Sequence, residues 1–405
     1  KGLQQFLVLV CHYILFAGRD STKAYQTLYL IMNRRLELAA AKQPLKLVER
    51  EIPEAPPKGA IVKLHYAGIC HSDVHFWEDE LDLGGGKVQA WSAHPAVNYP
   101  LVLGHENSGE IYSLGSEVDT AKLGMKVGDL VMVYPWGGCL ECAHCKDERF
   151  HSCPKLSEHI LGHTLPGGFE DYMAVPDVTY LIRTPDGVPM DVAALLTCSG
   201  ITAYHGIVTV LPSVQDHYRL HGSASLLIVG AGGVGLWGIQ IARQLMPEGT
   251  KIIVAEAFQS KFDDARKAGA DQTVLWPIDA TVEENVTAVK ELTPDGVAGA
   301  VDFVGGGKTT SSIFGCLAPD TMMVAIGLFG GEMTLPIPHL VLRRNVIRGC
   351  IVGDPVHVRE AANLVSDGKI RPPPITHVKL EDAQRVLEEL KAGTSRGRNV
   401  IKFIQ

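Results

Sequence analysis

The sequence predicts an α/β protein in which a β-rich domain is joined to a doubly wound parallel sheet. Three observations support this fold class. Between Pro44 and about Pro189, short apolar runs alternate with Gly and Pro, a pattern typical of a β-rich domain. From about Asp191 to Ile351, apolar runs of strand length alternate with helical stretches, which favours a parallel sheet covered by helices. A glycine-rich turn stands in this second region.

The glycine-rich turn lies between a predicted strand and a predicted helix. Four apolar residues, Leu226 to Val229, predict a buried parallel strand, and Val234 to Met246 carries apolar residues at helical spacing. Glycines in the pattern G-x-G-x-x-G permit a tight turn, close approach of the backbone to a pyrophosphate, and close packing of helix on strand. The sequence therefore predicts a Rossmann dinucleotide site at this turn. Its glycines are Gly230, Gly232, Gly233 and Gly235.

The next predicted strand, KIIVAEA, carries an acidic residue near its end, Glu256, twenty-one positions after Gly235. An acidic residue at about this distance binds the ribose hydroxyls of the adenosine half of NAD. Its negative charge also opposes the 2'-phosphate of NADP. We therefore expect NAD as the cofactor. Further strands are predicted at QTVLW, AGAVDFVG, TMMVAIG and NVIRGCIVG.

Four cysteines stand close together in the run CLECAHCKDERFHSC, at the spacing C-x2-C-x2-C-x7-C. One short loop with this spacing can surround a tetrahedral metal ion, and zinc with four protein ligands has no open position. The run therefore predicts a structural zinc site whose binding energy is also folding energy. Two disulfides are the alternative, but cysteines this dense in a long chain are more often metal ligands. The four are Cys139, Cys142, Cys145 and Cys153.

A second set of metal-ligand residue types is spread over three motifs. GICHSDVH contains Cys70, GHENSGEI contains His105, and LLTCSGITAYHG contains Cys198. Two thiolates and one imidazole would leave the fourth position of a zinc ion for water or substrate, as a catalytic zinc requires. Each residue alone is weak evidence, because a lone Cys is usually a small buried hydrophobe and a lone His is usually a satisfied core residue. Their order and their neighbours favour the metal hypothesis.

These motifs resemble the zinc-containing alcohol dehydrogenases of the medium-chain dehydrogenase/reductase family. The likeness runs from about Pro44 to Phe403 and rests on GICHSDVH, VLGHENSGEI, the four-cysteine lobe, VGAGGVG and RGRNVIKF, in the family's order. The resemblance implies a GroES-like catalytic domain with the structural-zinc lobe at 32–190. It also implies a Rossmann domain at 191–351 and a return to the catalytic domain at 352–405.

The resemblance implies roles for the residues around the second metal site. By this resemblance Cys70, His105 and Cys198 are the catalytic zinc ligands. Glu106 matches a carboxylate beside the metal that can enter its coordination sphere. Asp73 matches the acid that holds the ligand histidine, in keeping with the rule that metal-bound imidazoles donate their other N–H to a carboxylate. Two zinc ions per chain are therefore expected.

Three residues of GICHSDVH match positions of the family outside the metal ligands. Ser72 and His75 match the proton relay, and His71 matches a contact to the cofactor pyrophosphate. The alternatives are that Ser72 is a turn residue and that the two histidines are solvated surface imidazoles.

Four further positions match cofactor contacts. Thr202 is expected near the nicotinamide and Arg398 near the pyrophosphate, although Arg396 is a close neighbour with the same chemistry. Lys261 matches a basic residue near the adenosine ribose, and an isolated exposed lysine is its alternative interpretation. The family more often has Asp where this chain has Glu256, which is one methylene longer.

The resulting expectation is an NAD-dependent, zinc-containing alcohol dehydrogenase that converts a primary or secondary alcohol reversibly to an aldehyde or ketone. A polyol (sorbitol-type) dehydrogenase is the alternative within the fold, but that branch commonly has a carboxylate in place of Cys198. A non-catalytic, zinc-stabilised member of the family is the alternative from another class. The sequence retains every catalytic ligand, which argues against it.

Composition agrees with an enzyme of two domains. The chain has 405 residues, of which 46% are hydrophobic and 20% charged, with a formal charge of −8 and no basic stripe. Nucleic acid and membrane are therefore not expected as partners. Thiolates must stay reduced to hold zinc, which favours the cytoplasm. By family resemblance we expect a homodimer or homotetramer formed through the Rossmann domain.

Two segments differ from this pattern. Residues 1–31 form an extension of doubtful status, in which Phe6 to Gly18 imitates the apolar region of a signal peptide but is too short to span a bilayer. Met32 is a candidate for the true start, and an annotation artefact or a disordered extension is favoured over a secretion signal. The stretch from Phe76 to Pro100 is longer than is usual in the family. Its aromatic residues Phe76, Trp77 and Trp91 are candidates for the wall of an apolar substrate pocket.

Overall fold

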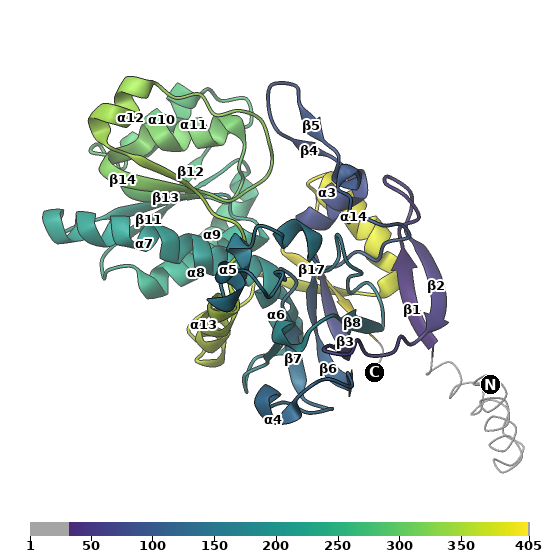
Figure 1. Ribbon diagram of the computed structural model, residues 1–405. Coiled ribbons are helices and arrows are strands. Elements are labelled where there is room, and N and C mark those ends of the chain that lie inside the picture. Colours follow the sequence, from purple (N-terminus) through teal and green to yellow (C-terminus); the bar gives the residue numbers. More distant parts are fainter. Residues whose placement is uncertain (1–31, 404–405) are drawn as a thin grey trace, which may run out of the picture.

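The computed structural model describes residues 32–403, so the extension at 1–31 lies outside the described residues. Figure 1 shows two bodies, one built on a mixed sheet and one on a parallel sheet. This arrangement confirms the predicted α/β fold, with a β-rich part and a part built on a parallel sheet.

The first body contains a seven-stranded sheet in the order β16-β17-β3-β6-β7-β9, with β8 paired to β3. Its strands run antiparallel except β16 and β17, which are parallel. The last two strands come from the end of the chain, so the chain returns to this body after leaving it. The strands are β3 (Ala60–Ile69), β6 (Glu106–Leu114), β7 (Leu130–Val133), β8 (Tyr172–Val175), β9 (Leu181–Arg183), β16 (Ile375–Val378) and β17 (Arg398–Lys402), beside the separate hairpin of β1 (Met32–Glu37) and β2 (Lys46–Glu51).

The second body is a six-stranded, wholly parallel sheet in the order β12-β11-β10-β13-β14-β15. Numbered within this body, the order is 3-2-1-4-5-6, the order of the Rossmann fold. All six predicted strands are present, and every residue of the central strand β10 is buried. The strands are β10 (Ser225–Val229), β11 (Lys251–Glu256), β12 (Gln272–Leu275), β13 (Val297–Asp302), β14 (Leu317–Ala325) and β15 (Val346–Gly349).

Helices cover both faces of the parallel sheet. In Figure 1, α10 and α11 lie above it, and α7 and α8 lie below it. The helix predicted after the glycine-rich turn is α8 (Gly233–Leu245). The other helices of this body are α7 (Ile201–His221), α9 (Phe262–Ala268), α10 (Val282–Lys290), α11 (Gly307–Cys316) and α12 (Ile337–Arg343). The helices outside this body are α3 (His71–Glu78), α4 (Thr120–Leu123), α5 (Ala143–Lys146), α6 (Met190–Leu195), α13 (Pro355–Ser366) and α14 (Ala383–Lys391).

One continuous helical stretch, Met190–His221, joins the two bodies. Its first part, α6, packs on β3 and β6, and its last part, α7, packs on β13 and β14. The stretch is long and apolar enough to cross a membrane, but 78% of its most apolar window is buried inside the protein. It is therefore a core helix, and its middle turn is available to place side chains between the two sheets.

The long stretch after α3 forms a small hairpin of β4 (Leu81–Asp82) and β5 (Val88–Gln89). Figure 1 shows it rising from α3 toward the second body. The tip contacts that body closely: a Cβ added at Gly84 would lie 2.2 Å from Cγ of Glu332, and one at Gly330 would lie 2.6 Å from Cβ of Asp82. The hairpin thus forms a second connection between the bodies, beside the helical stretch.

Candidate active site and metal centres

The four cysteines of the predicted lobe come together as a possible metal site. Their sulfur atoms all lie within 4.8 Å of one another. Backbone N–H groups donate to three of these sulfurs, for example from Cys142 to Cys139 and from Cys145 to Cys142, both at 3.4 Å. Such N–H donors stabilise thiolates, and those from Glu141 and Cys142 lower the pKa of Cys139 to about 6. None of the cysteines that the structure describes is in a disulfide, so the geometry fits zinc.

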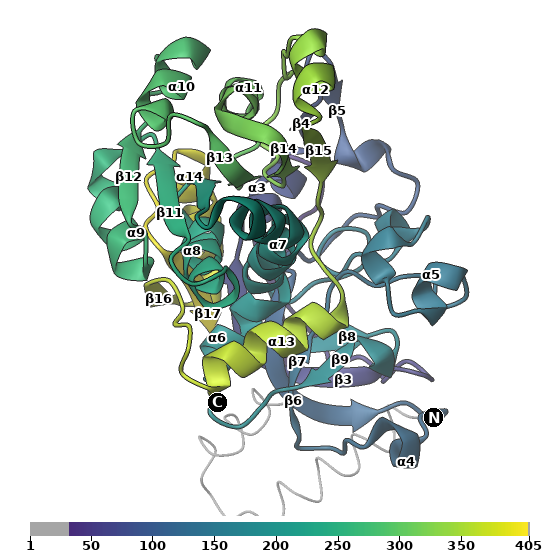
Figure 2. The same cartoon turned by 90° about the vertical axis from the view of Figure 1, so that its left-hand side faces the viewer.

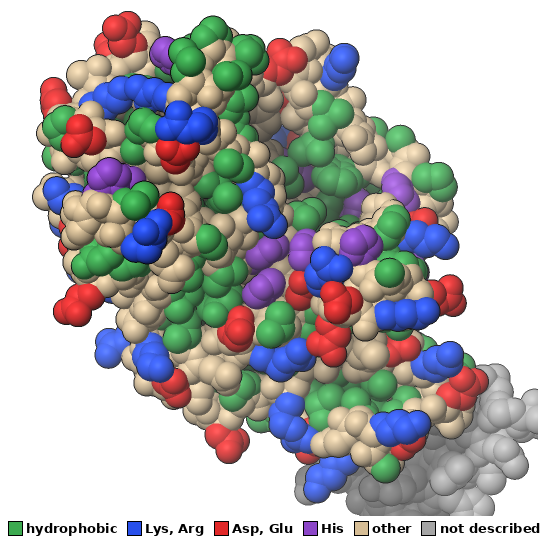
Figure 3. Space-filling view, turned by 60° about the vertical axis from the view of Figure 1, so that its left-hand side comes forward, with side chains coloured by type: hydrophobic (Ala, Val, Ile, Leu, Met, Phe, Trp, Pro, Cys, Tyr) green, Lys and Arg blue, Asp and Glu red, His purple; other side chains and the backbone are tan. Residues whose placement is uncertain are grey.

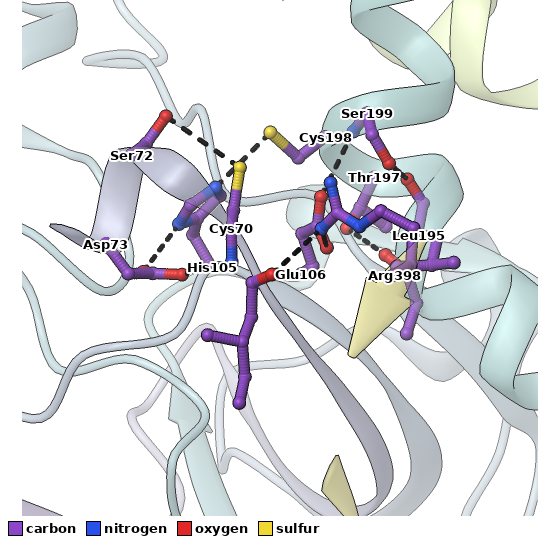
Figure 4. A network of polar contacts seen from close by, with 12 residues as sticks. Cys70, Ser72, Asp73, His105, Glu106, Leu195, Thr197, Cys198, Ser199 and Arg398 are labelled. Carbon is purple, nitrogen blue, oxygen red and sulfur yellow. Dashed lines mark hydrogen bonds and ion pairs between the residues drawn. The ribbon is translucent and has the colours of Figure 1, made fainter. Parts of the chain in front are cut away.

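A second cluster joins residues from distant parts of the chain, as Figure 4 shows. Ligand atoms of Cys70, His105, Glu106 and Cys198 all lie within 4.8 Å of one another, and all four residues are buried. Cys70 caps the N-terminus of α3, His105 directly precedes β6, and Cys198 lies in the π-helical turn η5 (Leu196–Gly200). Insertions of this π-helical kind are frequent at functional sites. The structure thus brings together the residues expected to bind the catalytic ion.

Asp73 fixes the orientation of the His105 ring. Its Oδ1 lies 2.9 Å from Nδ1 of His105, while the carboxylate also accepts hydrogen bonds from the backbone N–H of Cys70 at 2.9 Å and of Gly104 at 3.2 Å. Burial lowers the pKa of His105, but Asp73 outweighs burial and the net pKa lies well above its usual value. With Nδ1 held by the carboxylate, Nε2 faces Cys198 Sγ at 3.2 Å.

The charges of this cluster fit a bound cation. The hydrogen bond between the two thiols lowers the pKa of Cys70, and the same bond raises the pKa of Cys198. The two sulfurs therefore compete for one negative charge, and a cation bound between them would favour both as thiolates. Two sulfurs and one imidazole nitrogen are a ligand set that zinc takes with a position left open.

Arg398 connects the second cluster to the glycine-rich turn. Its Nη2 forms an ion pair with Glu106 Oε2 and donates to the carbonyl of Ile69 at 3.3 Å. Burial raises the pKa of Glu106 to about 7, against the lowering effect of Arg398. A Cβ added at Gly233 would lie 2.5 Å from Cδ of Arg398. Arg398 therefore lies where a pyrophosphate contact is expected, but its guanidinium also holds Glu106.

The glycines of the turn differ in their surroundings. Gly230 has φ of 94°, which L side chains rarely adopt, and a Cβ at Gly235 would lie 1.9 Å from the carbonyl oxygen of Gly230. Among the described residues, no atom lies within 4 Å of a Cβ added at Gly232. This glycine leaves open space at the N-terminus of α8, where backbone N–H groups can approach an anion.

Glu256 reaches back to the glycine-rich turn rather than pointing freely outward. Its carboxylate accepts hydrogen bonds from the backbone N–H of Ala231 at 2.8 Å, of Ala257 at 2.9 Å and of Phe258 at 3.1 Å. Lys261 Nζ lies 3.5 Å from Oε1. The expected pair at the adenosine ribose is thus assembled, with the carboxylate already occupied by protein donors.

The residues expected to form the relay lie on the first turns of α3. Ser72 Oγ is 3.9 Å from Cys70 Sγ. His75 is half-buried, His71 is exposed, and the centroids of their rings are 5.2 Å apart. Burial, followed by the nearby His71, lowers the pKa of His75. Thr202, expected near the nicotinamide, is buried one turn after Cys198.

The three aromatic residues between Phe76 and Pro100 that were expected at the substrate pocket have different surroundings. Phe76 has its ring centroid 6.3 Å from that of His105 and 5.3 Å from that of Trp91. Trp77 faces another way, because its Nε1 donates to the carbonyl of Gln43 at 2.8 Å. The rings of Phe76 and Trp91 thus lie on the side of the metal cluster, whereas Trp77 packs away from it.

Two residues beside His105 were not singled out from the sequence. The Trp136 ring lies 5.3 Å from the His105 ring, and its Nε1 donates to the carbonyl of Thr197 at 3.2 Å. His163 stacks on Phe76 with centroids 4.0 Å apart. Neither belongs to a motif whose spacing carries chemistry, so only the three-dimensional contacts reveal them. Figure 3 shows a hollow between the two bodies whose wall carries hydrophobic side chains and histidines.

Comparison with known proteins agrees with this fold and these clusters. The family described as the alcohol dehydrogenase GroES-like domain matches residues 56–186, and the family described as zinc-binding dehydrogenase matches 233–367. An NAD-dependent alcohol dehydrogenase of Sulfurisphaera tokodaii is 31% identical over 377 residues, covering 91% of this chain and 99% of that protein. The D-arabinose 1-dehydrogenase (NADP(+)) of Saccharolobus solfataricus is 26% identical over 373 residues, covering 92% and 98%.

Among solved structures, the alcohol dehydrogenase of the archaeon Aeropyrum pernix has a TM-score of 0.78 and 26% identity, covering 91% of this chain and 100% of that one. Fold and clusters together define a zinc-binding dehydrogenase with a dinucleotide-binding sheet. The chain belongs to the zinc-containing alcohol dehydrogenases of the medium-chain dehydrogenase/reductase family. The family resemblance seen in the motifs is thereby confirmed, and the chain is an oxidoreductase.

We predict two zinc ions per chain, one for each cluster. Cys153→Ser is expected to lose one ion and much of the stability, because zinc binding in small structural sites is worth ~10–16 kcal/mol. Cys70→Ser is expected to lose the other ion and all turnover while the fold survives. Metal analysis of reduced protein, combined with thermal unfolding, measures both. A wild type with fewer than two ions, or equal destabilisation by the two variants, would contradict the assignment.

Proposed function

We propose that this chain catalyses the NAD-dependent oxidation of an alcohol to an aldehyde or ketone, and the reverse reduction. The observation that carries the proposal is the buried cluster of Cys70, His105 and Cys198, which is linked through Glu106 and Arg398 to the glycine-rich turn. A metal site and a dinucleotide site are thus separated by one side chain. This juxtaposition is what hydride transfer between an alcohol and a nicotinamide needs.

We assign zinc to the cluster, with Cys70, His105 and Cys198 as its ligands. When bound there, zinc supplies Lewis acidity that lowers the pKa of an alcohol oxygen. Asp73 holds the imidazole so that Nε2 stays free for the ion. Glu106 adds a buried carboxylate whose charge Arg398 compensates.

Protein residues manage the proton and the orientation of the cofactor. NAD supplies the hydride acceptor when bound. We assign Ser72, whose Oγ lies beside Cys70, to receive the alcohol proton, and His75, further along α3, to pass it to solvent. Open space at Gly232 receives the pyrophosphate, with His71 and Arg398 as its side-chain contacts. Thr202 is assigned to the nicotinamide side, and Glu256 with Lys261 to the adenosine ribose.

We further propose the division of the described chain into a catalytic domain at 32–190 and 352–403 and a Rossmann domain at 191–351. A homodimer through the Rossmann domain is supported by its last strand, β15, and the neighbouring α12. Both carry exposed apolar residues, among them Val341, Leu342 and Val346, and β15 is the edge strand of the parallel sheet. The thiolate ligands support a reducing compartment such as the cytoplasm.

A polyol or sugar dehydrogenase is the second candidate, because one relative is named D-arabinose 1-dehydrogenase (NADP(+)). A screen of primary alcohols, secondary alcohols, polyols and aldoses with NAD+ separates the candidates when followed at the nicotinamide absorbance. Simple alcohols are expected to be oxidised by the wild type and not by Cys70→Ser. Turnover of polyols or aldoses alone would favour the second candidate, and no turnover by protein with two zinc ions would overturn both.

For cofactor choice, we predict that the wild type prefers NAD to NADP. The Glu256 carboxylate would repel a 2'-phosphate and can hydrogen-bond the ribose, and bonds to a charged group are worth about 1.5–3 kcal/mol, or roughly ten- to a hundredfold. Glu256→Gln keeps an acceptor for Ala231 N–H and removes the charge, so its ratio of kcat/KM for NADP to that for NAD should rise by this factor. Lys261→Ala is the matched control, expected to lower the use of NADP. Equal use of both cofactors by the wild type would show that Glu256 does not contact the ribose.

For the proton relay, we predict that His75→Ala lowers kcat most at low pH. A lowered pKa keeps the imidazole of His75 neutral, and so able to accept a proton, to a pH below that of a free histidine. Without it the proton must leave to hydroxide, which is scarce in acid, and positioned proton transfer is worth ~10²–10⁴-fold. The pH dependence of kcat for wild type, His75→Ala and His71→Ala measures the effect. A parallel profile for His75→Ala and the wild type would show that His75 is a surface imidazole only.

A further inference from the structure

His163 is a buried histidine beside the metal cluster whose ring nitrogens are unused. Its residue is 2% exposed, and among the described residues neither Nδ1 nor Nε2 has a hydrogen-bond partner. The backbone before it lies against that of the ligand histidine, since a Cβ at Gly162 would lie 3.1 Å from His105 N. Buried polar atoms in native proteins are rarely left without a partner. The unused nitrogens therefore point to a group that binds there.

Trp91 adds a second unused donor at the same place. Its ring meets the His163 ring edge to face, with centroids 4.9 Å apart, and its buried Nε1 also lacks a partner among the described residues. Trp91 begins the short helix η1 (Trp91–Ala93), and the next residue, Ser92, is anchored by two hydrogen bonds of 2.6 Å to Asp79 at the end of α3. The Phe76 ring, from α3, stacks on the His163 ring and also meets the His105 ring edge to face. The donors are therefore held in a fixed place.

The chemistry of the pair selects a neutral oxygen. Burial, followed by the nearby His94 and His105, lowers the pKa of His163 to about 4, so the ring is neutral at physiological pH. A neutral imidazole has one N–H donor and one acceptor nitrogen, and an indole has one donor. A hydroxyl group can donate a hydrogen bond to the acceptor nitrogen of the imidazole and accept one from the indole N–H. A carboxylate would be buried without a compensating cation, which is costly.

We propose that His163 and Trp91 form a subsite that hydrogen-bonds a second hydroxyl of the substrate, so that the enzyme prefers diols and hydroxylated alcohols to simple alcohols of the same length. This inference rests on the proposed function, since the subsite lies beside the proposed reaction centre. Cys198 argues against the metal site of the polyol branch, but not against a hydroxylated substrate. Phe76 and Trp91 would cover the carbon chain between the two oxygens.

The test compares 1-butanol with 1,2-, 1,3- and 1,4-butanediol, which scan the distance between the two oxygens. In the wild type, kcat/KM for at least one diol should exceed that for 1-butanol about ten- to a hundredfold, the range of a buried hydrogen bond or two. His163→Phe keeps a flat ring on Phe76 and removes both nitrogens. It should abolish this preference mainly through KM for the diol and leave 1-butanol unchanged, whereas His163→Gln should retain part of the preference.

Two further variants keep the test informative if His163→Phe folds poorly. Trp91→Phe removes only the indole donor and should reduce the diol preference. Trp77→Phe is the matched control, because Trp77 donates to Gln43 and faces away from the site, and it should leave the preference intact. If every diol is used no better than 1-butanol, or if His163→Phe and Trp91→Phe lower kcat/KM for all four substrates alike, the subsite is refuted.

A binding measurement separates the failure of the subsite from the failure of the proposed function. Calorimetric titration of the zinc-loaded wild type with NADH and each alcohol involves no oxidation, because the cofactor is already reduced. Tighter binding of a diol that is lost in His163→Phe would support the subsite even without turnover, in which case the proposed function fails. Turnover of 1-butanol with equal binding of all four alcohols would overturn the subsite and leave the proposed function standing.

Discussion

The structure depends on mutual compensation of charges in a buried place between two sheets. The ligand atoms of two thiols, an imidazole and a carboxylate lie within 4.8 Å of one another, and all four residues are buried. Burying such groups is costly unless opposite charges and hydrogen bonds accompany them. Asp73 and Arg398 provide part of this compensation, and a cation bound by the two sulfurs and the imidazole would complete it. The partners come from α3, β6, η5 and β17, so the site assembles only when distant parts of the chain have folded.

The fold and the four-cysteine lobe could be predicted because each follows from a local pattern. The strand β10 is an apolar run buried on both faces, and a glycine turn followed by an amphipathic helix is a local signal. The lobe cysteines lie close enough in sequence for their spacing to indicate one metal site. Cys70, His105 and Cys198 are far apart, and only the family's motif order joined them; the structure places all three together.

The remaining features depend on reach and contact that no spacing encodes. Glu256 was predicted to bind a ribose from its distance after the glycines, and no spacing could show that its carboxylate also accepts from the backbone N–H of Ala231. Arg398 was expected at the pyrophosphate, yet it also pairs with Glu106 across the cluster. His163 has no motif around it, and its unused nitrogens become apparent only once Phe76 and Trp91 are seen to enclose it. The contact of the β4–β5 hairpin with Glu332 is equally remote in sequence.

The helical stretch Met190–His221 links the position of the metal cluster to the relative position of the two bodies. Its first part packs on the mixed sheet and its last part on the parallel sheet, while Cys198 lies in the π-helical turn between them. Cys70 and His105, in contrast, are held by α3 and β6 of the first body alone. A shift of one sheet relative to the other therefore changes the position of Cys198 against Cys70 and His105, unless the wide turn of η5 absorbs it. Because Arg398 touches both Glu106 and Gly233, the same shift reaches the glycine-rich turn, so metal geometry and cofactor position are physically linked.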